Sequence, residues 1–174
     1  MYVAIMGYGV VGSGVATLLN KNHEHIVKKS MQSEMELKYI LDRRTFPGDP
    51  VKNWGPAYYF SICAPDGTVM GTCDLRIGQN DSLYYGGHIG YRVEEPYRGH
   101  HYAEKACRLL FQLAKKHGFT SLYITCNPDN IPSARTCERA GGTLVEIAEL
   151  PADSDMRRKG ETHKCIYQFD LTIL

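Results

Sequence analysis

The chain has 174 residues, enough for one domain, or one domain with a small appendage, to bury a hydrophobic core. Its 20 basic and 19 acidic side chains give a net charge of +1, so it lacks the positive field that nucleic-acid binding usually requires. Four glycines interrupt the uncharged first nineteen residues and no basic segment precedes them, which fits neither a signal peptide nor a membrane span. We therefore expect neither nucleic acid nor a membrane as a partner.

The cysteines are dispersed and form neither a C-x-x-C pair nor a zinc-binding cluster with histidine. Four of them lie inside apolar or β-rich runs, where a free thiol behaves as a small buried hydrophobe. This usage favours a reducing, cytoplasmic compartment, and we expect no metal. The six are Cys63, Cys73, Cys107, Cys126, Cys137 and Cys165.

The first fifty residues read as a strand, a glycine-rich turn, a helix and a second strand. The apolar run 2–6 is followed by Gly7-Tyr8-Gly9-Val10-Val11-Gly12 and by a helical stretch to about Lys29. The run 36–41 reads as the second strand and ends at Asp42. A G-x-G-x-x-G sequence in this setting is the fingerprint of a dinucleotide-binding βαβ unit.

Proline and glycine mark the joint between two predicted parts, residues 1–50 and residues 51–174. The segment 43–56 contains three prolines and two glycines, a composition that regular helices and central strands do not tolerate. Beyond it, the β-rich runs 58–63, 68–77 and 84–93 are separated by turn sequences. They predict an antiparallel meander.

The remainder alternates helices and strands. Apolar residues at i, i+3 and i+4 spacing predict an amphipathic helix over 102–117, and Gly118 follows as its cap. A short strand at 121–125 and a helix from Ile131 to Gly141-Gly142 come next. Two strands around 143–149 and 164–171, joined by a polar loop, complete the chain.

The strongest local signal lies where the third β run enters the helix at 102. A helix start presents unpaired N–H groups and about half a positive charge to an anion, and Arg98 adds a full charge. An isolated string of this kind is also compatible with an ordinary turn carrying a surface arginine. The run Thr125-Cys126-Asn127-Pro128, one helix and one strand later, favours the binding site.

Together these segments resemble the GNAT superfamily of N-acetyltransferases over about residues 57–171. That family's cofactor loop reads R/Q-x-x-G-x-G/A, and its second helix opens with N-x-x-A/S and ends near E-K-x-G-F. The chain has Arg98-Gly99-His100-His101-Tyr102-Ala103, and later Asn130-Ile131-Pro132-Ser133 and Glu138-Arg139-Ala140-Gly141-Gly142. The resemblance implies an α/β (α+β) fold with a mixed central sheet and helices on both faces, plus the N-terminal βαβ fragment. It is strongest to the branch that includes ribosomal-protein N-terminal acetyltransferases, which does not fix the substrate.

Acetyl-CoA is the co-substrate that the resemblance implies. By analogy, the backbone of Tyr91 and Val93 pairs with the pantetheine arm, and Asn127, Asn130 and Ser133 lie beside the pantetheine and the thioester. The pyrophosphate is held by the loop of Arg98, Gly99, His100, His101, Tyr102 and Ala103.

Two positions depart from the family pattern. His101 stands where the family has the first glycine of its loop, so the backbone must reach the phosphate without glycine's freedom, unless the imidazole itself contacts the cofactor. Cys137 stands where many members have a tyrosine that protonates the leaving thiolate. A thiol of ordinary pKa, about 8.5, can supply that proton, and packing is the alternative role.

The implied reaction is attack of a neutral amine on the thioester, aided by positioning and by a backbone N–H aimed at the developing oxyanion. A general base is expected near the strands where the acceptor enters. Asp74, His88 and Glu95 are the candidates, and each also reads as a structural or solvated charge. The acceptor is predicted to be a primary amine of a small molecule or peptide, and homodimer formation stays open.

Residues 1–50 resemble the start of homoserine dehydrogenase. A Rossmann domain needs two mononucleotide halves, and at most the first βαβ is present, so we do not expect NAD(P) to bind productively. A solitary βαβ must dock on another sheet. We therefore interpret residues 1–33 as a gene-fusion appendage, with 36–41 supplying the first strand of the main sheet. The alternatives are a regulatory protein that binds acetyl-CoA or a nucleotide without turnover and, more remotely, a vestigial dehydrogenase fragment.

Overall fold

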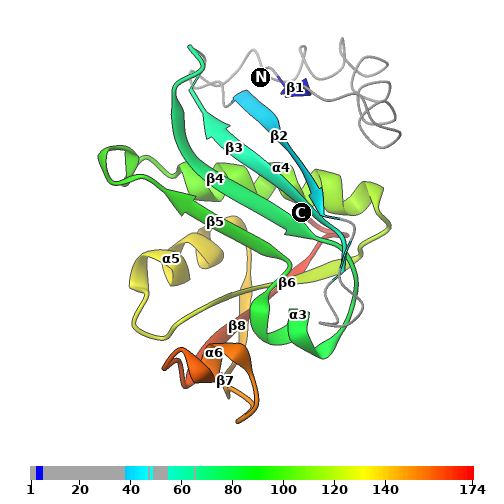
Figure 1. The fold of residues 1–174 in the computed structure, drawn as a ribbon, viewed down its shortest axis with the longest axis vertical. Helices are drawn as coiled ribbons and strands as arrows, with labels where there is room; N and C mark the ends of the chain where they lie inside the picture. Colours follow the sequence, from blue (N-terminus) through cyan, green and yellow to red (C-terminus); the bar gives the residue numbers. More distant parts are fainter. Residues whose placement is uncertain (1–2, 6–37, 47, 49–54, 65) are drawn as a thin grey trace.

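The computed structural model describes residues 3–5, 38–46, 48, 55–64 and 66–174 (Figure 1). The glycine-rich sequence 7–12 and the helix expected up to Lys29 lie outside these residues. Within them, the expected α/β fold is confirmed, but the single mixed sheet of the prediction is divided into two sheets.

The larger sheet has five strands in the order β1-β2-β3-β4-β5. β1 and β2 are parallel and every later pair is antiparallel, so the predicted meander is confirmed for β3, β4 and β5. One boundary is wrong, because residues 43–46, assigned to the joint, continue β2. These four residues contain no glycine or proline and end in Thr45 and Phe46, both good strand formers. The five strands are β1 (Val3–Ile5), β2 (Lys38–Phe46), β3 (Ala57–Cys63), β4 (Val69–Arg76) and β5 (Ile89–Val93).

The first part of the third predicted β run is a helix instead. α3 spans Asp81–Gly86, and strand β5 starts only at Ile89. The Asn80 side chain caps α3 by accepting a hydrogen bond from the N–H of Leu83 at 2.9 Å. Gly87, with a φ of 73°, ends it. This capping outweighs the strand propensity of the two tyrosines inside the helix.

The smaller sheet has the order β6-β8-β7, with both pairs antiparallel. The two predicted helices and all three strands of this part are confirmed to within about two residues. A short helix, α6, stands in the loop that was expected to be only polar. The elements from the end of β5 onward are η1 (Glu95–Tyr97), α4 (Tyr102–Lys116), β6 (Ser121–Cys126), α5 (Ile131–Ala140), β7 (Thr143–Glu149), α6 (Asp155–Arg158) and β8 (His163–Asp170).

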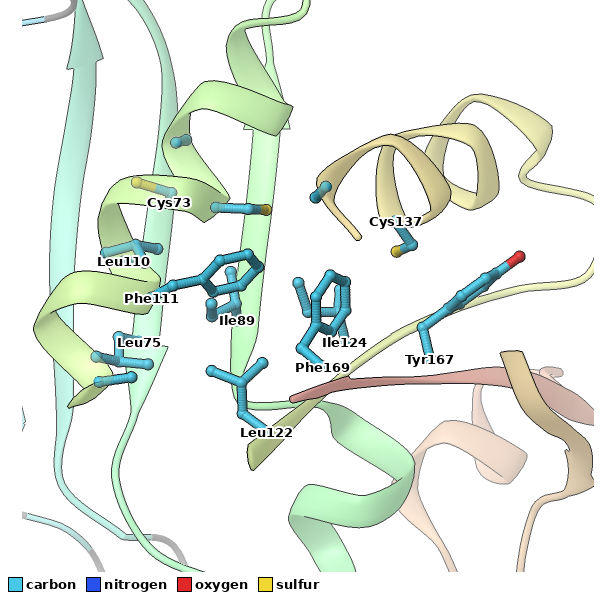
Figure 2. Packing of buried hydrophobic residues seen from close by; sticks show 14 of the residues in the cluster. Cys73, Leu75, Ile89, Leu110, Phe111, Leu122, Ile124, Cys137, Tyr167 and Phe169 are labelled. Atoms are coloured by element: carbon cyan, nitrogen blue, oxygen red, sulfur yellow. The ribbon is translucent and has the colours of Figure 1, made fainter. Parts of the chain in front are cut away.

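One hydrophobic core joins the two sheets. One face of helix α4 is buried in this core. Its Phe111 packs against Phe169 of β8, with the ring centroids 5.0 Å apart (Figure 2). Ile89 of β5 and Ile124 of β6 belong to the same cluster. Burying one such side chain contributes about 1.5–3 kcal/mol, so this cluster fixes how the sheets meet.

Strands β5 and β6 lie side by side at their starts and separate toward their ends, where α5 lies (Figure 1). At the start, the backbone N–H of His88 donates to the carbonyl oxygen of Tyr123 at 2.7 Å. The backbone N–H of Tyr123 donates in return to His88 Nδ1 at 3.0 Å. The two sheets are therefore fastened at one end and spread apart at the other.

Candidate functional site

The loop between β5 and α4 has a constrained backbone. It runs through η1 to Arg98, whose Nε donates to the carbonyl oxygen of Val93 at 3.1 Å. Gly99 follows with a φ of 85°. His101, the residue before α4, has a φ of 59°, and it is the one non-glycine residue with positive φ in the part of the chain that the structure describes. A left-handed non-glycine residue costs about 1–3 kcal/mol, and such strain concentrates at functional sites.

The departure of His101 from the family's glycine is thus one of side chain and not of backbone. His101 has the left-handed conformation that glycine adopts without strain, and it adds an imidazole to the loop. Arg139 Nη1, from the end of α5, lies 3.1 Å from His101 Nδ1. Because a guanidinium only donates, Nδ1 is the acceptor, and in the neutral ring the proton is on Nε2.

Helices α4 and α5 are also joined behind this loop. Arg108 Nη2 donates to the carbonyl oxygen of Arg139 at 2.7 Å, and its Nε pairs with Glu104 at 3.2 Å. The charge of Arg108 is balanced by Glu104, so Arg98 and Arg139 are the arginines that add positive charge beside the start of α4. This surrounding positive charge adds to the helix macrodipole in favouring an anion.

At the start of α5, two asparagines are held in different ways. Asn130 caps the helix, its side-chain oxygen accepting from the N–H of Ser133 at 3.2 Å. Asn127 Oδ1 accepts from Lys164 Nζ at 2.6 Å, and Lys164 is in turn ion-paired with Glu161. Since an ammonium only donates, the oxygen of the Asn127 amide is engaged and its NH₂ remains a donor. Sequence reasoning missed Lys164 and Glu161, which no motif marks.

Three predicted site residues converge between β5 and α5. The hydroxyl of Tyr91 lies 2.8 Å from Ser133 Oγ and 3.8 Å from Cys137 Sγ. Burial raises the pKa of the Cys137 thiol to about 12 and raises the pKa of Tyr91 well above its usual range. The ordinary thiol pKa assumed for Cys137 is therefore wrong, because this side chain is only 1% exposed.

His88, a candidate base, is buried and fully hydrogen-bonded. Its Nδ1 accepts from the N–H of Tyr123, so its Nε2 carries the proton and donates to the carbonyl oxygen of Gly78 at 3.2 Å. Burial lowers the pKa of His88, which keeps the ring neutral. The structure gives His88 the role of fastening the two sheets.

Asp74 and Glu95, the other candidates, lie apart from the Tyr91 group. Asp74 pairs with Arg76 Nε at 2.9 Å. Burial raises the pKa of Asp74, and the neighbouring guanidinium opposes that shift. Asp74 is opposite Gly90 in the ladder, so it lies on the sheet face away from the Tyr91 side chain. Glu95 is exposed at the start of η1.

All six cysteines are buried and none forms a disulfide. Within the described ranges, no group of three or more His, Cys, Asp or Glu side chains is arranged to hold a metal ion. None of the described helices combines the length and apolarity needed to cross a membrane.

The fold is that of solved acetyltransferases. The chain is similar to the ribosomal-protein-S5-alanine acetyltransferase of Vibrio fischeri, with 17% identity and a TM-score of 0.51 over 66% of this chain and 61% of that one. It is similar to the Microcin C7 self immunity acetyltransferase MccE, solved in complex with acetyl-CoA and AMP, with 22% identity and a TM-score of 0.53 over 66% and 61%. It is also similar to the ribosomal L7/L12 alpha-N-protein acetyltransferase RimL, with 19% identity and a TM-score of 0.52 over 66% of this chain and 70% of that one.

The chain spans 61% of the length of the first two of these proteins, and at such identities the likeness supports the fold alone. No curated protein matches the sequence. Residues 17–143 match the family model described as an acetyltransferase (GNAT) domain. Because that match covers well over half of the sequence, the chain belongs to the GNAT acetyltransferase family.

Proposed function

We propose that the protein is an acetyl-CoA-dependent N-acetyltransferase that acts on a primary amine of a small molecule or peptide. The observation that carries the proposal is the backbone of His101 in the loop Arg98–Ala103. It is left-handed, a conformation that glycine adopts without strain, and it stands at the start of a 15-residue helix with Arg139 beside it. These residues fit a pyrophosphate, which needs backbone N–H donors and positive charge.

The pantetheine arm would lie along the free edge of β5. β5 is the last strand of its sheet, and β6 belongs to the other sheet, so the edge at Tyr91 and Val93 has no ladder partner among the described strands. Arg98 donates to the carbonyl oxygen of Val93 in the structure. Cofactor binding would therefore turn Arg98 away from Val93 and toward the pyrophosphate, while Asn127 offers its NH₂ group to a carbonyl oxygen of the pantetheine.

The chemical step needs a neutral amine held against the thioester. Asp74 stays the candidate base, because it is half-buried and its pKa is raised. Its sheet face suits an acceptor that arrives from the side opposite α5. His88 is left out of the proposal as a base, since both of its ring nitrogens are in hydrogen bonds.

We also propose that residues 1–50 are an appended gene-fusion segment and that residues 51–174 form the acetyltransferase domain. The support is the resemblance of the first fifty residues to homoserine dehydrogenase. β1 pairs with β2 in parallel, as in a βαβ unit, and β2 pairs antiparallel with β3 of the main sheet, which is the arrangement that a docked βαβ fragment requires. A truncation starting at residue 34 should keep its melting temperature and its acetyl-CoA binding, and NAD(P) binding by the intact chain would contradict the proposal.

Thermal-shift titration tests the proposed cofactor. A ligand at 100 times its Kd stabilises a protein by about 2.7 kcal/mol. Acetyl-CoA and CoA should raise the melting temperature, whereas NAD and NADP should not. A panel of amines and peptide N-termini, assayed for CoA release, then identifies the acceptor. Binding of acetyl-CoA with no release across the panel would favour the regulatory alternative.

A further inference from the structure

A tyrosine hydroxyl from another element lies beside Cys137. Cys137 occupies the α5 position at which the family resemblance places a tyrosine. The hydroxyl of Tyr91, which comes from β5, lies 3.8 Å from Cys137 Sγ and 2.8 Å from Ser133 Oγ. A phenol is therefore present beside the position that has lost one.

We propose that the Tyr91 hydroxyl is a catalytic residue that donates a hydrogen bond, and then its proton, to the CoA sulfur as that sulfur leaves. This inference rests on the proposed function. A hydroxyl donates one hydrogen and accepts at two lone pairs. Ser133 Oγ can therefore donate to the Tyr91 oxygen. The phenol hydrogen has a weak acceptor in the carbonyl oxygen of Ser133, 3.4 Å away, which a CoA sulfur would replace.

The step balances without any further reactant. The amine nitrogen forms a bond to the acetyl carbon, the C–S bond breaks, and its electron pair goes to sulfur. The phenol proton then passes to that sulfur to give the CoA thiol. The nitrogen of the product releases one proton to water, and the phenolate regains one from water, so the net reaction consumes an amine and a thioester and yields an amide and a thiol.

The surroundings disfavour a sulfur anion, so a hydrogen bond and a proton from a neighbouring donor both stabilise the leaving sulfur. Cys137 samples the same environment, and burial raises the pKa of its thiol to about 12. Burial also raises the pKa of Tyr91, so at neutral pH the phenol is protonated and can donate a hydrogen bond to the sulfur. Burial is the largest cause of both shifts.

Paired ligands test the contact. Calorimetric titration should show that wild type binds CoA about 3- to 10-fold more tightly than desulfo-CoA, as one hydrogen bond to the sulfur predicts. Tyr91→Phe keeps the ring and should abolish that preference while it binds acetyl-CoA within about twofold of wild type. Its rate of CoA release with an accepted amine should fall about 100-fold or more, as loss of an acid–base group predicts.

Two further variants keep the test decisive. Tyr167→Phe removes a buried hydroxyl from β8 near the same thiols and should keep the preference for CoA. Ser133→Ala removes the hydroxyl that orients Tyr91 and should partly weaken the preference for CoA over desulfo-CoA. If Tyr91→Phe does not fold, this variant still tests the contact.

Three results overturn the inference, and they differ in what else they overturn. The role of Tyr91 is contradicted if Tyr91→Phe still prefers CoA over desulfo-CoA as strongly as wild type does. It is also contradicted if Tyr167→Phe loses that preference. Neither result affects the proposed function. Failure of wild type to bind both CoA and acetyl-CoA removes the proposed function as well.

Discussion

The two ends of strand β5 are built for opposite purposes. At its start, His88 joins the sheets through one backbone and one side-chain hydrogen bond to Tyr123. At its end, Tyr91 turns to α5 and Val93 accepts from Arg98, with no strand of the described residues paired to that edge. Two strands that separate at one end keep their arrangement only if they are held together at the other, so we call the end at His88 the closed end and the unpaired end at Tyr91 and Val93 the open end. His88, predicted as a base, thus has a structural role. Its hydrogen bonds hold β5 and β6 together at one end, and the predicted cofactor residues lie at the other end, where the strands separate.

Breaking the closed end should have the largest effect. His88→Leu leaves the buried N–H of Tyr123 and the carbonyl oxygen of Gly78 without a partner, and each costs about 1–3 kcal/mol. We expect a loss of about 3 kcal/mol in the free energy of unfolding, measured by urea titration. His163→Leu, at an exposed position, should cost less than about 0.5 kcal/mol. Equal losses in the two variants would refute the fastening role.

Disabling the open end should reduce binding and leave the fold intact. Arg98→Gln removes a charge from the proposed pyrophosphate loop, and a charge-assisted hydrogen bond is worth about 1.5–3 kcal/mol. Acetyl-CoA should bind about 10- to 100-fold more weakly by calorimetry. Arg92→Gln is the matched control, because Arg92 is an exposed arginine of β5 that pairs with Glu94 on the other sheet face. A similar loss in both variants would indicate only a diffuse electrostatic effect.

A smaller effect is expected where β8 supports the open end. Lys164→Met removes the donor that holds Asn127 Oδ1, so the amide can rotate and present its oxygen instead of its NH₂. We expect the KM for acetyl-CoA to rise about 3- to 10-fold with little change in kcat. Lys159→Met, at the exposed end of α6, should change neither. A fall in kcat at constant KM would place Lys164 in the chemical step instead.

The last expected effect comes from pH, and it acts on the closed end alone. Because the pKa of His88 is lower in the folded than in the unfolded protein, the unfolded state binds more protons below pH 6.5. The stability contributed by neutral His88 is therefore complete above pH 6.5 and is lost as pH falls. The loss is about 1.4 kcal/mol for each pH unit between 6.5 and the folded pKa. His88→Gln should remove this part of the pH dependence, and an unchanged slope would contradict it.

Local patterns predicted most of the fold but only part of the site. Helix α4 and helix α5 are long, amphipathic and followed by glycine, so their signal was strong. Helix α3 was missed because its one clear cue, Asn80 before an acidic residue, stood next to two tyrosines with high strand propensity. The loop Arg98–Ala103 could be proposed as a cofactor loop from the sequence because its motif lies within six consecutive residues.

The contacts that define the site join residues far apart in the chain. Tyr91 meets Ser133 across 42 positions, Asn127 meets Lys164 across 37, and His88 meets Tyr123 across 35. No periodicity or spacing in one sequence encodes such pairs. For the same reason, the role of His88 and the division of the sheet became apparent only from the structure.

Hydrogen–deuterium exchange of the backbone amides, with and without acetyl-CoA, tests the central claim most directly. The account predicts that acetyl-CoA slows exchange in the peptides containing Tyr91, Val93 and the loop 99–103. Exchange at Tyr123, whose N–H is already hydrogen-bonded to His88, should hardly change. Protection confined to other regions, or no protection at saturating acetyl-CoA, would contradict the assignment of the open end of β5 as the cofactor site.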